Sequence, residues 1–168
     1  MRKNIRFLSH AALIAALYAA VSYLQNLLLP GTASSAIQFR VSEALCILAL
    51  FTPAAIPGLG IGCFVFNLSV AGWLPMDFLA GTAASALAAG FMWLTRNLKW
   101  KSCPLIALLM PALVNGLIVG GELALTIGGG FWFNATCVAI GELGVLLTLG
   151  NALYYIMKAQ KLDSRLFQ

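Results

Sequence analysis

Long hydrophobic stretches, separated by short polar or basic segments, run along almost the whole chain. The longest lie at about residues 7–29, 104–127 and 134–158, and each is long enough for a helix across a bilayer, which takes about 20 residues. Pro30-Gly31 ends the first stretch, and Gly128-Gly129-Gly130 separates the last two, because these residues break helices. The pattern predicts membrane-spanning α-helices.

Three more hydrophobic segments, at about 39–52, 58–71 and 76–95, complete the pattern. The first two are short and are separated by Pro53 and Pro57, so we expect a tight turn between them, buried in the bundle or near the inner surface. The predicted fold is all-α, a single-domain bundle of six transmembrane helices over residues 1–168.

The basic start of the chain, Met1 to Arg6, resembles that of a secretory signal. The apolar stretch behind it exceeds the roughly 7–15 residues of a signal, and further hydrophobic segments follow. We therefore expect the first segment to be retained as a transmembrane helix.

Composition agrees with a lipid environment, since 61% of the residues are hydrophobic and only 9% are charged. This balance excludes a water-soluble domain. The four cysteines form no C-x-x-C pair, so neither a metal site nor a disulfide framework is predicted. The net charge of +5 comes from short clusters between apolar segments rather than from one soluble face, which argues against nucleic acid as a partner.

The basic clusters instead predict orientation, because cytoplasmic loops collect Lys and Arg. With both termini in the cytoplasm of a bacterial cell, nine of the ten basic residues lie on the inner side of the cell membrane. Those nine are Arg2, Lys3, Arg6, Arg96, Lys99, Lys101, Lys158, Lys161 and Arg165. Arg40 is the exception and falls near the outer end of the second helix.

Four of the five acidic residues fall in the outer half of this topology: Glu43, Asp77, Glu122 and Glu142. Glu122 and Glu142 lie about 8 and about 12 Å below the outer ends of their helices. An ionisable group at that depth needs a polar cavity, a partner or a ligand. The acids could pair with Arg40 or with Asn67, Asn115 and Asn134 to fasten the bundle. Otherwise they line an outward-facing pocket for a ligand that is cationic or rich in N–H donors.

Aromatic and small residues add two further candidates. Trp73 and the Phe131-Trp132-Phe133 run lie on the outer side, where they could stack on a planar ring or form the interfacial aromatic belt. Alanines repeat at four-residue spacing in the first helix and leave it a smooth face, for packing within the chain or for docking to another membrane subunit. They are Ala11, Ala15 and Ala19, and Ala12, Ala16 and Ala20. No Walker A sequence is present, and His10 is the only histidine, so no ATPase or hydrolytic triad is predicted.

These features resemble the S component of an energy-coupling factor (ECF) transporter. More narrowly, the run Ile37-Gln38-Phe39-Arg40-Val41-Ser42-Glu43-Ala44-Leu45 resembles the signature of QueT-type, queuosine-precursor S components. The segment from Ala55 to Cys63, and Asp77 with Gly81-Thr82-Ala83, are similar to the same pattern. The resemblance implies a non-enzymatic subunit without a cofactor of its own. It would capture a 7-deazaguanine, such as 7-aminomethyl-7-deazaguanine or queuine, and deliver it through a T component and two ATPase subunits that use ATP.

Such a ligand suits the predicted pocket. A carboxylate can accept N1–H and the exocyclic amine together, Arg40, Gln38 or an asparagine can donate to the carbonyl oxygen, and a tryptophan can stack on the ring. A second carboxylate would hold an aminomethyl cation, while Glu43 could instead pair with Arg40. The predicted binding residues are Gln38, Arg40, Glu43, Asn67, Trp73, Asp77, Asn115, Glu122, Trp132 and Glu142.

Other functions stay open at this stage. The chain could be an S component for another vitamin or base, or a proton-coupled secondary transporter that acts alone and uses Glu122 and Glu142 as relays. A purely structural membrane protein would leave the four outer acids unexplained. A membrane enzyme lacks a recognisable metal cluster or nucleophile-base pair.

Overall fold

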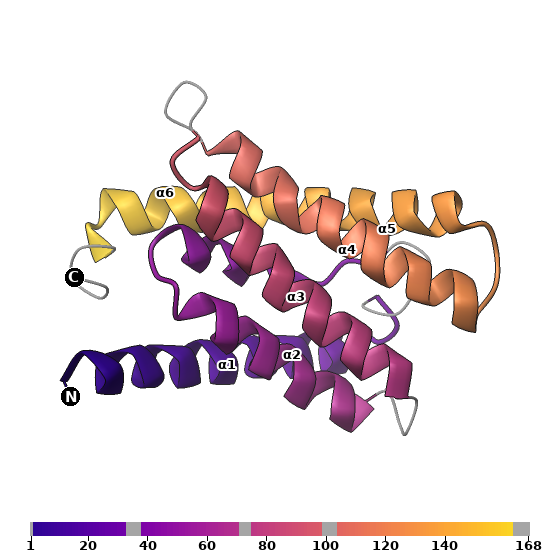
Figure 1. Ribbon diagram of the computed structural model, residues 1–168, viewed down its shortest axis with the longest axis horizontal. Coiled ribbons are helices and arrows are strands. Elements are labelled where there is room, and N and C mark those ends of the chain that lie inside the picture. Colours follow the sequence, from indigo (N-terminus) through magenta and orange to yellow (C-terminus); the bar gives the residue numbers. More distant parts are fainter. Residues whose placement is uncertain (1, 33–37, 71–74, 99–103, 163–168) are drawn as a thin grey trace.

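The computed structural model describes residues 2–32, 38–70, 75–98 and 104–162, and every regular element within these ranges is helical. Figure 1 shows α1 and α2 along one side, α4 and the long carboxyl-terminal helix along the other, and α3 between them. The elements are α1 (Arg2–Leu28), η1 (Val41–Leu50), α2 (Ala55–Val70), α3 (Pro75–Thr95), α4 (Leu105–Thr126), α5 (Phe131–Val145), η2 (Leu146–Gly150) and α6 (Asn151–Ala159).

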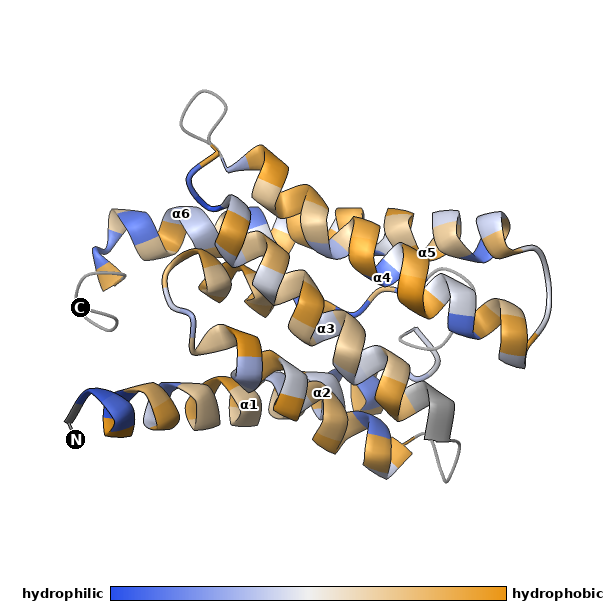
Figure 2. Cartoon of the chain, viewed as in Figure 1, coloured by the Kyte–Doolittle hydropathy of each residue, from blue (hydrophilic) through white to orange (hydrophobic). Residues whose placement is uncertain are grey.

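Four helices in the described ranges are long and apolar enough to cross a membrane. They are Lys3–Leu28, Phe78–Thr95, Leu105–Thr126 and the continuous helix Phe131–Ala159, in which η2 is a single π-helical turn. Their outward side chains are apolar, and hydrophobic residues cover most of the helices in Figure 2. Such a surface is suited to lipid rather than water.

The second predicted helix is present, but it is not the type of helix that we expected. We expected an α-helix over about 39–52, and the structure has η1, a 3-10 helix of ten residues. At about 2.0 Å per residue η1 is about 20 Å long, short of the roughly 30 Å hydrocarbon core. It contacts every other helical element, and residues 42–49 are all buried. Packing on all sides therefore holds η1 in the tighter helix, in the middle of the bundle.

The α2 helix, with 16 residues, is about 24 Å long and also falls short of a full span. The predicted helix 58–71 starts three residues earlier than expected, at Ala55. Pro57 is tolerated there because the first N–H groups of a helix have no partner within it. The six predicted helical segments are all present, while six complete crossings stay a prediction.

Glycines allow two pairs of neighbouring helices to approach closely. A Cβ on Gly58 of α2 would lie 2.8 Å from the carbonyl oxygen of Ala11, and one on Gly62 would lie 2.7 Å from that of Ala15. On the other side, a Cβ on Gly120 of α4 would meet the Ala135 backbone at 2.5 Å. The α1–α2 and α4–α5 pairs therefore pack backbone to backbone, as small residues permit in membrane helices.

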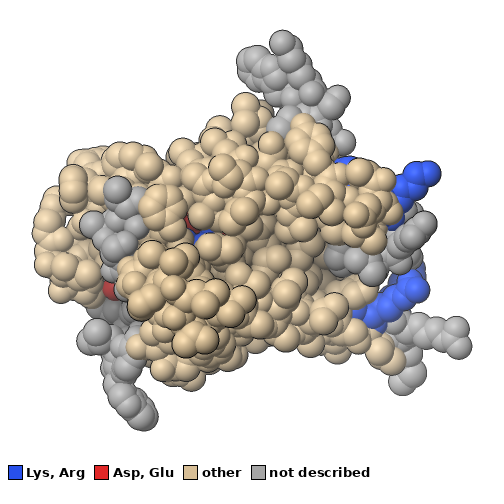
Figure 3. All heavy atoms as spheres, turned by 180° about the vertical axis from the view of Figure 1, so that it is seen from behind, with Lys and Arg blue, Asp and Glu red and all other residues tan. Residues whose placement is uncertain are grey.

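The two ends of the bundle differ in charge. The start of α1 and the end of α6 lie at the same end of the molecule in Figure 1, and Lys and Arg gather at that end in Figure 3. We call it the basic end, and Lys3, Arg6, Arg96, Lys158 and Lys161 are its described basic residues. This agrees with the distribution of charge on which the predicted topology rests, although the structure carries no membrane to orient it.

Candidate functional site

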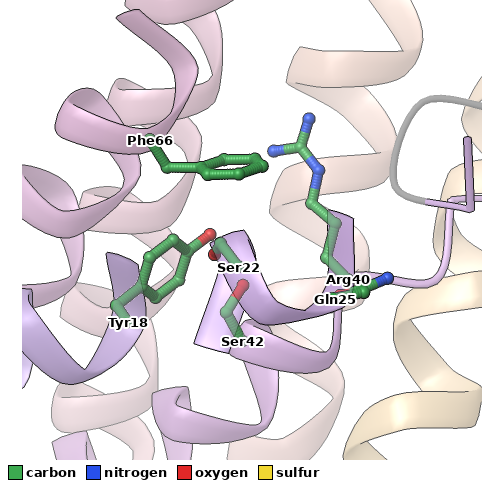
Figure 4. A pocket seen from close by; sticks show the side chains of 6 residues that line it. All are labelled: Tyr18, Ser22, Gln25, Arg40, Ser42 and Phe66. Atoms are coloured by element: carbon green, nitrogen blue, oxygen red, sulfur yellow. The ribbon is translucent and has the colours of Figure 1, made fainter. Parts of the chain in front are cut away.

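Arg40 reaches into the interior from the residue just before η1. Its backbone is extended, with φ −93° and ψ 97°, so the chain turns there from the preceding loop into the helix. The side chain lines a hollow together with Tyr18, Ser22, Gln25, Ser42 and Phe66. In Figure 4 its guanidinium extends to the level of the Phe66 ring, above the hydroxyl groups. These six residues define the Arg40 hollow.

Gln25 of α1 fixes the backbone on either side of Arg40. Its Oε1 accepts the Val41 N–H at 2.8 Å, and its Nε2 donates to the Phe39 carbonyl oxygen and, at 3.1 Å, to Thr32 Oγ1. The neighbouring Gln38 backbone lies against Gly141 of α5, at a place where a Cβ would collide with it. The segment that carries Arg40 is therefore clamped between α1 and α5.

Glu43 is completely buried, and its carboxylate already accepts three hydrogen bonds. Tyr18 and Ser85 donate to Oε1 at 2.5 and 2.8 Å, and the Cys46 thiol donates to Oε2 at 3.0 Å. Arg40 is not among its hydrogen-bond partners, but the two side chains lie close enough to interact electrostatically, so the pairing of Glu43 with Arg40 stays a prediction. Glu43 ties α1, η1 and α3 together below the hollow.

Glu142 of α5 has one oxygen in use and one open. Asn115 of α4 donates to Oε1 at 2.6 Å, whereas Oε2 is buried with no hydrogen-bond partner among the described residues. Glu142 and Arg40 lie close enough to interact electrostatically. An unpartnered buried carboxylate oxygen is costly, so this oxygen is a strong candidate to accept hydrogen bonds from a ligand.

Other buried polar atoms around Arg40 also lack partners within the described part of the chain. They are Arg40 Nε itself and the Ser22 hydroxyl in the Arg40 hollow. Protein interiors satisfy nearly all such groups. The cluster therefore combines unused donors and an unused acceptor in one region, which is the arrangement of a site that binds a polar ligand.

Gly81 of α3 makes room for this cluster. A Cβ there would lie 2.5 Å from Asn67 Nδ2 and 3.6 Å from Arg40 Nη1. Asn67 in turn donates to Cys63 Sγ at 3.4 Å. The Asn67 side chain thus occupies space that a side chain at position 81 would fill, and Arg40 lies next to it.

The Arg40 hollow is narrow. Although about 210 Å³ of empty space lies in and around it, none of this space is wide enough to admit a water molecule. A ring-sized ligand therefore requires movement of a wall, and the aromatic side chains among the lining residues are Tyr18 on α1 and Phe66 on α2.

The structure brings together six of the ten predicted binding residues. Arg40, Glu43 and Asn67 lie near one another, Asn115 is bonded to Glu142, and Gln38 packs against α5 through its backbone. Glu122 is buried and accepts a hydrogen bond from Thr126 at 3.3 Å. It lies seven residues beyond Asn115, on the same face of α4 and about 10 Å farther along the axis.

The other predicted aromatic and acidic residues are placed differently. Trp132 is 75% exposed and does not line the Arg40 hollow. Trp73 and the Asp77 side chain lie outside the described residues, although the Asp77 backbone belongs to α3. Stacking by Trp73 and binding by Asp77 stay predictions, and Tyr18 and Phe66 are the aromatic rings that line the hollow with Arg40.

Sequence reasoning missed Tyr18, Ser22 and Gln25. Their spacing of four and three residues places them on one face of α1, and a polar stripe on an otherwise apolar helix was the signal that could have found them. Phe66, Ser42 and Ser85 had no such signal, because their positions depend on how the helices pack together.

The alanine faces of α1 have two environments. Ala11 and Ala15 are buried against α2, so they serve packing within the chain, and Ala19 is half-buried. Ala12, Ala16 and Ala20 are exposed. These three form the part of the repeat that is accessible to another subunit.

Together, four helices long and apolar enough to cross a membrane, a lipid-suited surface and a buried ionisable cluster indicate a multi-pass membrane protein with an interior polar site. A family model described as QueT transporter matches residues 8–159, so the chain belongs to the QueT transporter family. It is therefore a membrane transporter protein, as the motif around Arg40 predicted. Searches of curated proteins and of solved structures found no match.

Proposed function

We propose that this chain is the substrate-binding S component of an ATP-driven ECF importer, and that it captures a 7-deazaguanine precursor of queuosine at the Arg40 cluster. The supporting observation is the pair of unused groups in the core, Arg40 Nε and Glu142 Oε2. Arg40 Nε–H can donate a hydrogen bond to a ligand, and Glu142 Oε2 can accept one from it.

The base edge of a 7-deazaguanine matches these groups. Its N1–H and exocyclic amine are two parallel donors for the Glu142 carboxylate, and its carbonyl oxygen can accept from the Arg40 guanidinium. Asn115 holds Glu142 from the opposite side, and the Phe66 ring provides a flat apolar surface. In this assignment Glu142 binds the ligand, whereas Glu43, with three donors of its own, positions the site.

Charge favours a cationic precursor. The cluster holds two carboxyl groups, Glu43 and Glu142, but one basic side chain, Arg40, in a region with little water, so a cation bound beside it is favoured. An aminomethyl group supplies that cation. Glu122, on the Asn115 face of α4, is our candidate for the carboxylate that holds it, and Asp77 is the alternative.

The proposed partners are a T component and two ATPase subunits in a bacterial cell membrane, with both termini of this chain in the cytoplasm. The accessible docking face is Ala12, Ala16 and Ala20 on α1, because α2 occupies Ala11 and Ala15. Tyr18, Ser22 and Gln25 stand on the same helix and line the Arg40 hollow. Movement of α1 on a partner would therefore act directly on the wall of the site.

The test is to purify the chain from cells grown with queuosine precursors and to identify the bound small molecule by mass spectrometry. We expect a 7-deazaguanine with a cationic substituent. Recovery of an unrelated vitamin would contradict the ligand assignment. Uptake by the chain alone in liposomes, driven by a proton gradient, would contradict the ECF assignment and support a secondary transporter.

A further inference from the structure

A second hollow lies at the basic end, away from the Arg40 cluster. About 410 Å³ of empty space lies in and around it. Water molecules fit inside, and their centres can occupy about 120 Å³ of that space. It is formed where η1 ends, α3 ends, α4 begins and α6 passes. The lining residues are Leu50, Phe51, Arg96, Asn97, Pro104, Tyr154 and Lys158.

Two cations border this hollow, and no acidic residue is among the described residues that line it. The Arg96 guanidinium lies over the Trp93 ring, 3.5 Å from its centroid, and Nη1 donates to the Trp93 carbonyl oxygen at 2.6 Å. Because an arginine has five N–H donors, this anchoring leaves others for a ligand. The guanidinium is thus held in place before anything binds.

The second cation is held by aromatic rings. Lys158 Nζ lies 5.2 Å from the centroid of the Phe51 ring, which stacks on Tyr154 at 5.8 Å. Cation–π contacts of this kind orient an ammonium group. The hollow therefore has a positive rim and an aromatic floor.

The depth of the hollow in the membrane follows from its surroundings. Trp93, Tyr154 and Tyr155 lie close to the basic end, and tryptophan and tyrosine concentrate at the level of the lipid headgroups. Basic pockets between transmembrane helices at this level bind anionic headgroups. We propose that this hollow binds the phosphate group of an anionic phospholipid, with Arg96 and Lys158 as its ligands. The inference does not rest on the proposed function of the Arg40 cluster.

The experiment compares retention of phosphatidylglycerol and phosphatidylcholine by the purified full chain, measured by native mass spectrometry. A basic residue near the membrane surface contributes about 1 kcal/mol to such binding, which is about fivefold in affinity. We expect preferential retention of phosphatidylglycerol, and a loss of about fivefold or more in each of Arg96→Gln and Lys158→Gln. Lys161→Gln, which removes the same charge from the turn just after α6 and outside the hollow, is the matched control.

Three outcomes would overturn the proposal. They are equal retention of the two lipids, an equal loss in the Lys161→Gln control, and unchanged retention in both hollow variants. A second arm adds inorganic phosphate alone and measures the unfolding temperature. If phosphate stabilises the protein as much as phosphatidylglycerol does, through the same two residues, the site takes free phosphate and the lipid assignment fails. Thermal unfolding of each variant shows whether it is folded, and Arg96→Lys, which keeps the charge, should retain most of the lipid.

Discussion

The Tyr18 hydroxyl donates to Glu43 Oε1 over 2.5 Å and so joins the first helix to the 3-10 helix in the centre of the bundle. Ser85 brings α3 to the same oxygen. Three elements that line or support the Arg40 site therefore meet at one buried carboxylate. Loss of any of its donors should loosen the site as well as the fold.

Tyr18→Phe tests this relationship, because it removes the hydroxyl and keeps the ring. Hydrogen bonds to charged groups contribute about 1.5–3 kcal/mol, so we expect a clearly lower unfolding temperature in detergent. Tyr23→Phe is the matched control on the same helix, since its hydroxyl bonds Ser69 at an exposed position. A fall as large in the control as in Tyr18→Phe would contradict the special role of the buried contact.

Gly81→Ala should impair ligand binding. The new methyl group would lie 2.5 Å from Asn67 Nδ2, so the Asn67 side chain beside Arg40 must shift. We expect at least about tenfold weaker binding of 7-aminomethyl-7-deazaguanine in calorimetry, the equivalent of one charge-assisted hydrogen bond. Gly90→Ala on the same helix has nothing within 4 Å of its Cβ and should bind normally. Unchanged binding in Gly81→Ala would show that Asn67 and Arg40 do not form the site.

The two alanine faces of α1 should respond differently to leucine. Ala15→Leu faces α2 and should lower the unfolding temperature, because overpacking of a tight contact costs about 1–3 kcal/mol. Ala16→Leu lies on the exposed face and should leave folding and ligand binding unchanged, while it abolishes uptake in cells that contain the partner subunits. Full uptake by Ala16→Leu would exclude this face as the docking surface.

The sequence predicted the helices better than the site, for a physical reason. Length and hydrophobicity are local properties, so segments such as 104–127 were located to within about one residue. The 3-10 conformation of η1 depends on neighbours from every other helix and leaves no local pattern. Likewise, the sequence predicted that Glu43, Glu122 and Glu142 all lie in the outer half of the membrane. It could not predict their hydrogen-bond partners, because these depend on the rotation of each helix about its axis.

The same reasoning explains why the sequence placed Arg40 correctly in the interior but did not do so for Trp132. A cation placed against the topological rule needs a local reason, and the structure supplies one in the Arg40 hollow. An aromatic residue at a helix end has a general reason to be there, the membrane interface, and the exposed Trp132 fits that explanation. Charges in lipid were therefore better guides to the interior than aromatic rings.

The most direct test of the central claim is the affinity of purified Glu142→Gln for 7-aminomethyl-7-deazaguanine, measured by calorimetry beside the wild type. The amide keeps the shape of the side chain but replaces an acceptor oxygen with a donor that faces the ligand's own donors. We predict a loss of about tenfold to a hundredfold, with Asp163→Asn, in the carboxyl-terminal tail, as the unaffected control. Wild-type affinity in Glu142→Gln would contradict the account.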